Sequence, residues 1–306
     1  MTRVLVLGGG PDAEREVSIA SATGVHAGLV EAGLDATLLI VDRPISEDIR
    51  SWDHDVIFPV LHGRFGEGGA LQILLERAST RFVGSGSRAS RLAMDKLATK
   101  LEAARLGIPT LSSSLLDPED TQCPFEGPVV IKPVADGSSC GLYLCPDESS
   151  WAEAITAIRA SRDQHPDRVS MIEPMVKGRE LTVGVIDDGN GSLRAFPIID
   201  IAPASGVYDY QAKYERNDTV YTVSPDLADE IEQKLTQWSL ALCGALGIRH
   251  LARVDFMMDT NGNVNLLECN TMPGFTRTSL LPKAAAASGM DMSTLCAHLV
   301  GCAQRE

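Results

Sequence analysis

Residues 253–270 have the residue types and spacing of a β-hairpin that could bind a metal ion. Two apolar runs flank the dipeptide Asn261-Gly262, which suits the positive φ angles of a two-residue type I′ turn. If Thr260 faces Asn263, the register of the whole hairpin is determined. The pattern therefore predicts which side chains meet on each face.

In this register, two carboxylates and a carboxamide share one face. Asp255 lies opposite Glu268 and Arg253 lies opposite Asn270, because alternate residues on a strand point to the same side. Opposed Cβ atoms are about 5 Å apart, so the carboxylates repel each other unless a proton or a cation lies between them. These hard oxygen ligands predict a Mg²⁺ site. The alternative is a surface hairpin with polar outward residues, but the other face is apolar: Val254, Phe256, Leu267 and Cys269.

A lysine on a predicted strand precedes a loop of small residues in the middle of the chain. Lys132 lies in the apolar run 129–133, and residues 136–141 read Asp-Gly-Ser-Ser-Cys-Gly. The backbone N–H groups and hydroxyls of such a loop can approach a phosphate closely, and the lysine supplies positive charge. The segment lacks the Walker A pattern. An ordinary glycine turn with a snorkelling lysine is the alternative.

The first loop follows a strand and contains Gly-x-Gly-x-x-Ala at residues 8–13, which satisfies a lenient dinucleotide-binding fingerprint. Acidic side chains at Asp12, Glu14 and Glu16 crowd the start of the next helix, where they oppose the binding of an anion. Glu14 is better placed to meet a cation, such as the ammonium group of an amino acid. The alternative is that these acids only complement the helix dipole.

Two further segments suit a nucleotide or a substrate. Residues 173–180 connect two predicted strands and could line an adenine and ribose site, with Glu180 accepting hydrogen bonds from the sugar hydroxyls. His62 follows a strand, where it could orient a carboxylate or a phosphate. A plain connecting loop and a structural histidine are the respective alternatives.

Composition and charge narrow the class of protein. The 306 residues carry 27 basic and 41 acidic side chains, a formal net charge of −14, which disfavours a surface for nucleic acid or for an anionic membrane. The seven cysteines form no Cys-x-x-Cys pair, as is typical of reduced thiols in a cytosolic protein. The N-terminus lacks a signal-peptide pattern, and no apolar run reaches the length of a membrane span. We expect a cytoplasmic enzyme.

The secondary structure that must position these residues follows one pattern in the first part of the chain and another in the rest. Strands at 3–8, 36–41 and 56–61 alternate with helices, which predicts a parallel, doubly wound α/β sheet with its site at the carboxyl ends of the strands. A single helix is expected at 87–106.

The rest of the chain has an α+β pattern. Strands are expected at 129–133, 142–145, 169–173, 181–186 and 194–199, and a long helix at 226–246. Residues 200–219 lack periodicity, and a loop of that length is typical of a lid or a binding loop. We therefore expect three domains: residues 1–95, 96–180 and 181–306.

Taken together, these segments resemble the ATP-grasp ligases, and among them the D-alanine:D-alanine ligase family. The matching segments follow in order over nearly the whole chain: residues 9–18, 61–67, 94–96, 132 with 137–139, 208–214 and 253–281. The resemblance implies an α/β ATP-grasp fold, α+β in the ATP-binding part, with an N-terminal Rossmann-like doubly wound domain and with ATP between two antiparallel sheets.

The resemblance also implies a role for each matching residue. ATP contacts are implied for Lys96, Lys132, Ser138, Ser139, Glu173, Val176, Glu180 and Lys213. Substrate contacts are implied for Glu14 and His62 at the first D-alanine, and for Ser279 and Leu280 at the carboxylate of the second. Catalytic roles are implied for a hydrogen-bonded set that ties the domains together, Glu14, Ser138 and Tyr214, and for an oxyanion hole, Arg253 and Gly274. Two Mg²⁺ (or Mn²⁺) would be held by Asp255, Glu268 and Asn270, with K⁺ as an optional further ion.

The implied reaction joins two D-alanines through an acyl phosphate to give D-alanyl-D-alanine, ADP and phosphate for peptidoglycan synthesis, and a homodimer is implied as well. Two positions depart from the family pattern: Gly68 stands where an aspartate is usual, and Cys140 replaces an aliphatic residue. The alternatives are a ligase with another acceptor (D-serine, D-lactate or a biosynthetic amino acid), an NAD-dependent oxidoreductase, and a non-catalytic nucleotide-binding regulator.

Overall fold

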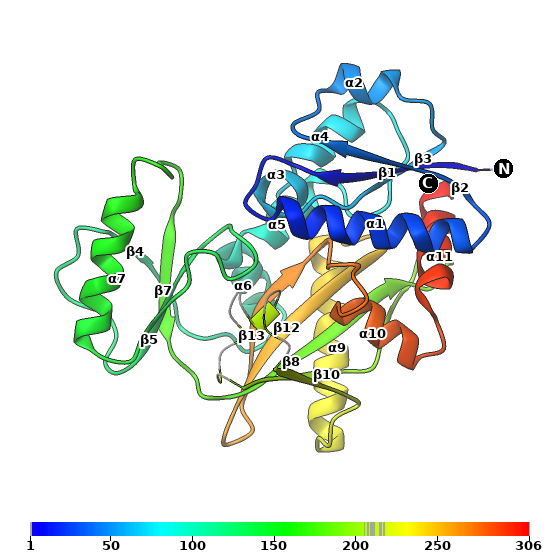
Figure 1. Cartoon of the computed structure of the whole chain (residues 1–306). Helices are drawn as coiled ribbons and strands as arrows, with labels where there is room; N and C mark the ends of the chain where they lie inside the picture. The colour runs from blue at the N-terminus through cyan, green and yellow to red at the C-terminus, as the bar shows by residue number, and fades with distance from the viewer. Residues whose placement is uncertain are drawn as a thin grey trace.

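The computed structural model describes residues 2–204, 206, 208, 212, 213, 216 and 218–305, and these residues form three β-sheets (Figure 1). The strands are β1 (Arg3–Gly9), β2 (Asp35–Val41), β3 (Val56–Pro59), β4 (Ser114–Leu116), β5 (Val129–Pro133), β6 (Tyr143–Cys145), β7 (Ser170–Pro174), β8 (Gly178–Asp187), β9 (Leu193–Ala195), β10 (Ile199–Pro203), β11 (Thr219–Val223), β12 (Leu251–Asp259) and β13 (Val264–Asn270). The helices are α1 (Arg15–Glu31), α2 (Ser46–Ser51), α3 (Gly63–Glu67), α4 (Ala70–Arg77), α5 (Ser87–Met94), α6 (Lys96–Arg105), α7 (Glu148–Ser161), α9 (Asp229–Leu246), α10 (Leu280–Ala287) and α11 (Met292–Gln304). In the described part of the chain, no helix combines the length and the apolar character that crossing a membrane requires.

The N-terminal sheet is parallel, with strand order β2-β1-β3. Both faces of β1 are buried: Val4 and Val6 join a core that includes residues of α1 and α11, whereas Leu5 and Leu7 join a core that includes residues of α4. A strand covered on both faces needs a continuous apolar run. The predicted parallel α/β arrangement is therefore confirmed.

The prediction of one helix at 87–106 is wrong, because the chain breaks at Asp95. Its backbone leaves the helical region (φ −80°, ψ 104°), and its carboxylate caps α6 by accepting hydrogen bonds from Leu97 N and Ala98 N, both at 2.9 Å. The backbone N–H of Lys96 then donates to Val134 O (3.0 Å). The break thus fixes the first turn of α6 against the end of β5.

The central sheet is antiparallel, with strand order β4-β7-β5-β6, and stands to one side of the molecule (Figure 1). Its core lies between one face of the sheet, which includes Val129, Ile131 and Ile172, and helix α7, which includes Trp151 and Ile155. Because residues on a strand alternate, the side chains between these apolar positions point to the other face. That face carries Lys132, Met171 and Glu173, all of which are buried.

The C-terminal sheet has strand order β11-β10-β8-β12-β13, with β9 beside β8. The strand predicted at 194–199 is wrong in extent, because β9 ends at Ala195 and β10 begins at Ile199. Both pair with β8. The stretch without periodicity, 200–219, starts inside β10 and ends in β11, and the antiparallel pairing of Pro203 with Thr219 brings its two ends together.

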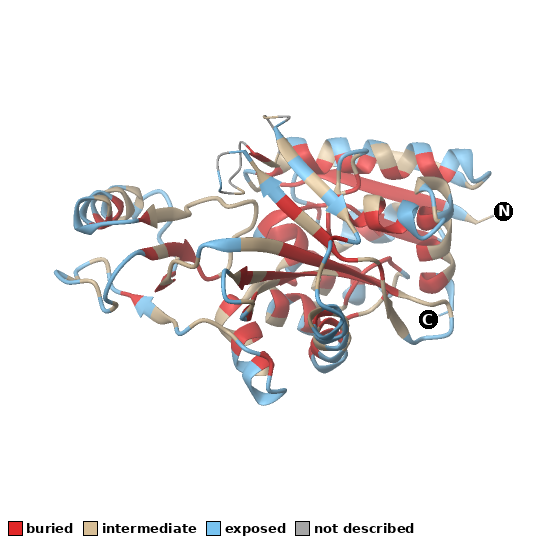
Figure 2. Ribbon diagram, turned by 90° about the horizontal axis from the view of Figure 1, so that it is seen from below, coloured by how far each residue is buried: buried red, intermediate tan, exposed pale blue. Residues whose placement is uncertain are grey.

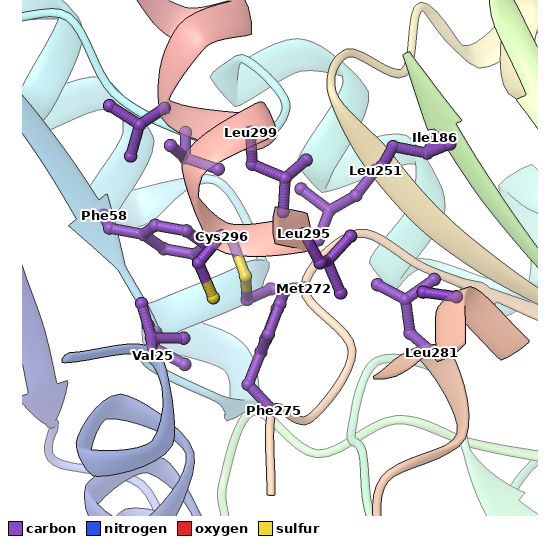
Figure 3. Close-up of a cluster of buried hydrophobic side chains, with 14 of the residues drawn as sticks. Val25, Phe58, Ile186, Leu251, Met272, Phe275, Leu281, Leu295, Cys296 and Leu299 are labelled. Atoms are coloured by element: carbon purple, nitrogen blue, oxygen red, sulfur yellow. The ribbon is translucent and has the colours of Figure 1, made fainter. Parts of the chain in front are cut away.

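The N-terminal sheet and the C-terminal sheet share one hydrophobic core, which also includes residues of α10 and α11 (Figure 3). The rings of Phe58 and Phe275 meet edge to face at 5.5 Å. Figure 2 shows the buried residues concentrated where these parts meet. The domain ranges expected from the sequence stay a prediction: α5 and α6 pack Ala89, Ala93 and Ala103 into the second core of the C-terminal sheet.

Candidate active site

The hairpin predicted at residues 253–270 is formed by β12 and β13, but its turn differs. Asp259 N donates to Asn263 O (2.9 Å), so three residues form the loop, and Gly262 adopts φ +84°. The prediction that Thr260 faces Asn263 is wrong. The Asp259 carboxylate explains the difference, because it accepts hydrogen bonds from Asn261 N and Asn263 N, both at 2.8 Å, and so stabilises the longer loop.

A β-bulge restores the predicted register where the candidate ligands lie. Arg253 pairs with Asn270 and Asp255 pairs with Glu268, as predicted. On the turn side of Asp255 the pairing shifts by one residue, and Leu267 is the extra residue of the bulge. The longer loop shifts the strand pairing by one residue, and the bulge shifts it back, so the pairing at Asp255 and Arg253 is the predicted one.

The bulge also changes the apolar face of the hairpin. The prediction that Leu267 lies on this face is wrong, because Leu266 is the residue buried in the core beside Phe256, and Leu267 is partly exposed. Val254 and Cys269 are buried in the same core, as the alternation predicts.

Asp255 is the centre of a hydrogen-bonded group on the site face of the C-terminal sheet. Arg253 donates to it twice, from Nε to Oδ1 (2.9 Å) and from Nη2 to Oδ2 (2.8 Å). Asn270 Nδ2 donates to Oδ2 (3.1 Å), and Thr182 Oγ1 donates to Oδ1 (2.5 Å). Thr182 was not predicted, because the pairing of β8 with β12 that brings it there has no local sequence signal.

Three acidic side chains crowd this face: Glu180, Asp255 and Glu268. Burial raises the pKa of Glu180 to about 7; nearby Lys213 opposes this rise, and the charges of Asp255 and Glu268 add to it. Glu268 also forms an ion pair with Lys96 (Nζ to Oε2, 3.3 Å). In the described residues, no three His, Cys, Asp or Glu side chains are grouped as a metal site. The oxygen atoms of Asp255, Glu268 and Asn270 are hard ligands of the kind that Mg²⁺ takes, although both oxygens of Asp255 accept hydrogen bonds in this structure.

Glu14 and Ser138 meet between the N-terminal and central sheets. Ser138 Oγ donates a hydrogen bond to Glu14 Oε1, and Glu14 is buried. Burial, helped by the charge of Glu67, raises the pKa of Glu14 to about 6, although Ser138 opposes the rise. The third member of the predicted set, Tyr214, lies outside the described residues.

The loop at residues 136–141 has an unusual backbone conformation. Ser138 and Ser139 have φ angles of 50° and 57°, in the left-handed region that residues other than glycine rarely adopt. Ser139 Oγ donates to the carbonyl oxygen of Tyr208 (3.2 Å). The hydroxyls of this loop thus reach both the N-terminal loop and the segment that follows β10.

His62 is buried at the end of β3. One ring nitrogen lies 3.3 Å from Glu67 Oε1, and the other lies 3.3 Å from Ser21 Oγ. Burial lowers the pKa of His62, but the hydrogen bond and charge of Glu67 raise it by more. Gly68 ends α3, where its N–H donates to Arg64 O (3.0 Å); a Cβ at this position would overlap that carbonyl.

A cavity of about 610 Å³ lies beside these groups, although Asp255 and Glu180 are not part of its lining. Its lining includes many of the residues to which a role was assigned from the sequence: Glu14, His62, Ser138, Lys213, Arg253, Glu268, Asn270, Gly274, Ser279 and Leu280. The lining residues without an assigned role include Tyr208, Arg216 and Tyr221. The hydroxyls of the two tyrosines are 3.1 Å apart, and the Lys213 ammonium lies 5.1 Å from the ring centroid of Tyr208.

Gly274 and Ser279 lie together in one part of the cavity lining. Ser279 is the N-cap of α10, and its Oγ accepts a hydrogen bond from Thr276 N (3.0 Å). A Cβ at residue 274 would lie 2.8 Å from Ser279 Oγ, so only glycine fits without a shift. Backbone N–H groups at the start of a helix attract anions, which suits this part of the cavity to a carboxylate.

The remaining ATP-binding residues expected from the sequence lie outside the lining of this cavity. Lys132 and Glu173 form a buried ion pair on the face of the central sheet opposite α7, and Val176 lies in the connection from β7 to β8. Lys96 Nζ donates to Asp136 O (2.7 Å) in the loop at residues 136–141. A further buried lysine, Lys100, contacts Glu173 and was not predicted, although its spacing of four residues from Lys96 on a helix was a usable signal.

Known proteins match both the sequence and this arrangement. The sequence profile of the family described as "D-ala D-ala ligase C-terminus" matches residues 116–301. A D-alanine--D-alanine ligase from Stutzerimonas stutzeri (strain A1501) is 41% identical over 297 residues, which are 96% of this chain and 91% of that protein. The chain belongs to the D-alanine–D-alanine ligase family.

Solved structures of D-alanine–D-alanine ligases and their relatives have the same fold. The ligase from Bacillus anthracis, solved in complex with ATP, superimposes with a TM-score of 0.80 at 28% identity, covering 100% of this chain and 98% of that one. A D-Ala:D-Ser ligase from Enterococcus faecalis gives a TM-score of 0.80 at 25% identity, covering 99% of both chains. The predicted ATP-grasp fold is therefore confirmed.

Proposed function

We propose that this protein is an ATP-dependent ligase that joins two D-alanines to give D-alanyl-D-alanine, ADP and phosphate for peptidoglycan synthesis. The observation that carries the proposal is that a buried carboxylate, Glu14, a guanidinium, Arg253, and the start of a helix at Ser279 line the same cavity. These are the three kinds of group that two amino acids and a developing oxyanion need. Family membership supports the assignment of ATP as the phosphoryl donor.

The two amino acids bind next to each other in the cavity. Glu14 pairs with the ammonium group of the first D-alanine, and His62 helps to orient that substrate. Ser279 and the N–H of Leu280 at the start of α10 receive the carboxylate of the second D-alanine. This arrangement directs the amine of the second substrate towards the carboxylate of the first.

The carboxylate of the first D-alanine is a poor electrophile and must be activated. One of its oxygens attacks the γ-phosphorus of ATP, and the bond to the ADP oxygen breaks, so that an acyl phosphate forms. Lys96, Lys132 and Lys213 neutralise the charge that develops on the phosphoryl group, with Ser138 and Ser139 closing over it. Asp255, Glu268 and Asn270 would hold two Mg²⁺ (or Mn²⁺), which when bound neutralise charge on the phosphates.

The amine of the second D-alanine then attacks the acyl carbon. Arg253 and the Gly274 N–H stabilise the tetrahedral oxyanion, and the bond to phosphate breaks as the peptide bond forms. Because water would hydrolyse the acyl phosphate, the site must exclude solvent. The role of residues 200–219 as a lid stays a prediction. The homodimer, the binding of K⁺ and the cytoplasmic location stay predictions as well.

The second candidate keeps the same chemistry with another acceptor, such as D-serine or D-lactate. The similarity of the fold to a D-Ala:D-Ser ligase favours this alternative over the unrelated oxidoreductase and regulator hypotheses. The difference would lie in the acceptor part of the cavity, near Ser279.

The test is release of ADP by the purified protein with Mg²⁺ and K⁺ over a panel of D- and L-amino acids, followed by mass spectrometry of the products. D-alanine alone should support turnover and yield D-alanyl-D-alanine. Turnover that requires a different amino acid, with none on D-alanine, would refute the substrate assignment. Mixed products from D-alanine and a second acceptor would favour the alternative.

A further inference from the structure

Lys100 lies on α6 one helical turn after Lys96, so the two side chains share one face of the helix. Lys96 reaches the C-terminal sheet through Glu268, whereas Lys100 reaches the central sheet through Glu173. The Lys100 ammonium lies 2.6 Å from Glu173 Oε2 and donates to Leu111 O at 2.8 Å. Helix α6 thus presents one lysine to each of the two sheets between which ATP is proposed to bind.

Glu173 is almost fully buried, with 2% of its surface exposed, and both of its oxygens are engaged. Lys132 Nζ contacts Oε1, and Lys100 Nζ contacts Oε2. Lys132 and Glu173 lie on the same sheet face, because Glu173 pairs with Val130, two residues before Lys132 on β5. Two ammonium groups therefore share one carboxylate.

Lys100, Lys132 and Glu173 therefore form a cluster of two basic side chains and one acidic side chain. If Glu173 faced Lys132 alone, the carboxylate would neutralise that lysine and hold it away from a phosphate. Burial would raise the pKa of Glu173, but the attraction of Lys132 and Lys100 outweighs it and lowers the pKa. Glu173 is therefore an ionised acceptor held between two donors.

We propose that Lys100 is a positioning residue for the nucleotide, holding the Glu173 carboxylate so that Lys132 keeps its charge and its direction for ATP. The inference rests on the proposed function only for the identity of the nucleotide. A lysine is costly to bury, and an apolar side chain on this helix face would avoid that cost. The competing explanation is that Lys100 only ties α6 to the connection after it through Leu111.

Lys100→Met separates the two explanations, because it keeps the length of the side chain and removes the charge. We expect the affinity for ADP, measured by calorimetry without amino acid, to fall about tenfold or more. The KM for ATP should rise in parallel, while the KM for D-alanine changes less than about twofold. Unchanged ADP affinity in a variant that is less stable would show a structural role and overturn the proposal.

The double variant Lys100→Met with Glu173→Gln tests whether Lys100 acts through Glu173. We expect its ADP affinity to lie within about twofold of that of Glu173→Gln alone, because a neutral residue at position 173 no longer forms an ion pair with Lys132. Fully additive losses would show that Lys100 acts independently of Glu173, against the proposal.

Three further variants control for the position, the charge and the folding effect of the substitution. Lys234→Met removes a lysine whose ion pair with Glu230 is exposed on α9, and it should leave ADP affinity unchanged. Lys100→Arg, which keeps the charge, should retain more ADP affinity than Lys100→Met.

If Lys100→Met does not fold, Lys100→Gln is the replacement, because it keeps a hydrogen-bond donor without the charge. Wild-type ADP affinity in that variant would overturn the proposal. A wild-type protein that binds ADP without turning over D-alanine would refute the proposed function alone.

Discussion

Ser138 and Glu14, which lie 124 positions apart in the chain, form a hydrogen bond between the central and N-terminal regions. The bond joins the loop assigned to the phosphates with the carboxylate assigned to the first amino acid. The two proposed substrates of the first step are thus linked through one contact.

Ser138→Ala should lower kcat/KM for D-alanine by about ten- to a hundredfold. A hydrogen bond to a charged group contributes about 1.5–3 kcal/mol, and its loss leaves the buried carboxylate with one donor fewer. Steady-state kinetics with coupled ADP detection measure this change. Ser161→Ala is the control, because its hydroxyl bonds only within the end of α7, and equal losses in both variants would contradict the assigned role of Ser138.

The affinity for the first D-alanine should fall as the pH drops through about 6. The pKa of Glu14 is about 6 because of burial, so below that pH the side chain gains a proton and loses the charge that pairs with an ammonium group. A plot of kcat/KM for D-alanine between pH 5 and 8 should show this ionisation. A plot that is flat through pH 6 would count against Glu14 as the ammonium ligand.

Glu14→Gln should stabilise the fold at pH 7.5 while it lowers activity. Because the folded-state pKa of Glu14 is raised from 4.5 to about 6, its favourable contribution is present below about pH 4.5 and is lost as the pH rises through 6. At neutral pH the buried charge is therefore destabilising, by roughly 2 kcal/mol. Urea unfolding at pH 7.5 and pH 4 should show a stabilisation by Glu14→Gln at the higher pH only.

Removal of divalent metal with a chelator should abolish ADP release, and Mg²⁺ or Mn²⁺ should restore it. Asp255→Asn and Glu268→Gln should each lower kcat by about a hundredfold or more, because they remove anionic ligands from the phosphoryl-transfer site. Binding of Mn²⁺ in the presence of ADP, followed by electron paramagnetic resonance, measures the metal directly. Asn265→Ala, on β13 with Glu268 but outside the ligand set, is the control; full Mn²⁺ binding by Asp255→Asn would exclude Asp255 as a ligand.

Gly262→Ala should destabilise the protein by about 1 kcal/mol. Gly262 has φ +84°, and the nearest atom to an added Cβ is 3.9 Å away, so strain in the left-handed conformation is the main effect. Gly244→Ala, inside α9 with open space around it, should instead stabilise by about 0.5–1 kcal/mol. Guanidinium unfolding measures both changes, and a neutral effect of Gly262→Ala would count against the positive φ angle at this residue.

Local patterns predicted the parts of the site that lie on one continuous segment. The pairing of Asp255 with Glu268 follows from strand alternation and a turn signal, and it was correct even though the turn was not. Thr182 and Lys100 were missed because each reaches the site through a neighbour that is distant in sequence: the pairing of β8 with β12, and the contact of α6 with Glu173 on β7. Asp95 was missed as a helix start because apolar periodicity runs through it, whereas its non-helical backbone and its capping hydrogen bonds mark the break in the structure.

Because of the bulge on β13, the two strands of the hairpin should differ in how well they tolerate insertions and deletions. β12 pairs residue by residue with β8 from Leu251 to Asp259, without interruption, whereas the extra residue, Leu267, is accommodated on β13. A one-residue deletion at Leu267 would leave the opposition of Asp255 and Glu268 intact, but the same deletion within β12 would shift side chains against two neighbouring strands at once. Natural insertions and deletions in this hairpin should therefore accumulate in its loop and on β13, while the length of β12 stays constant.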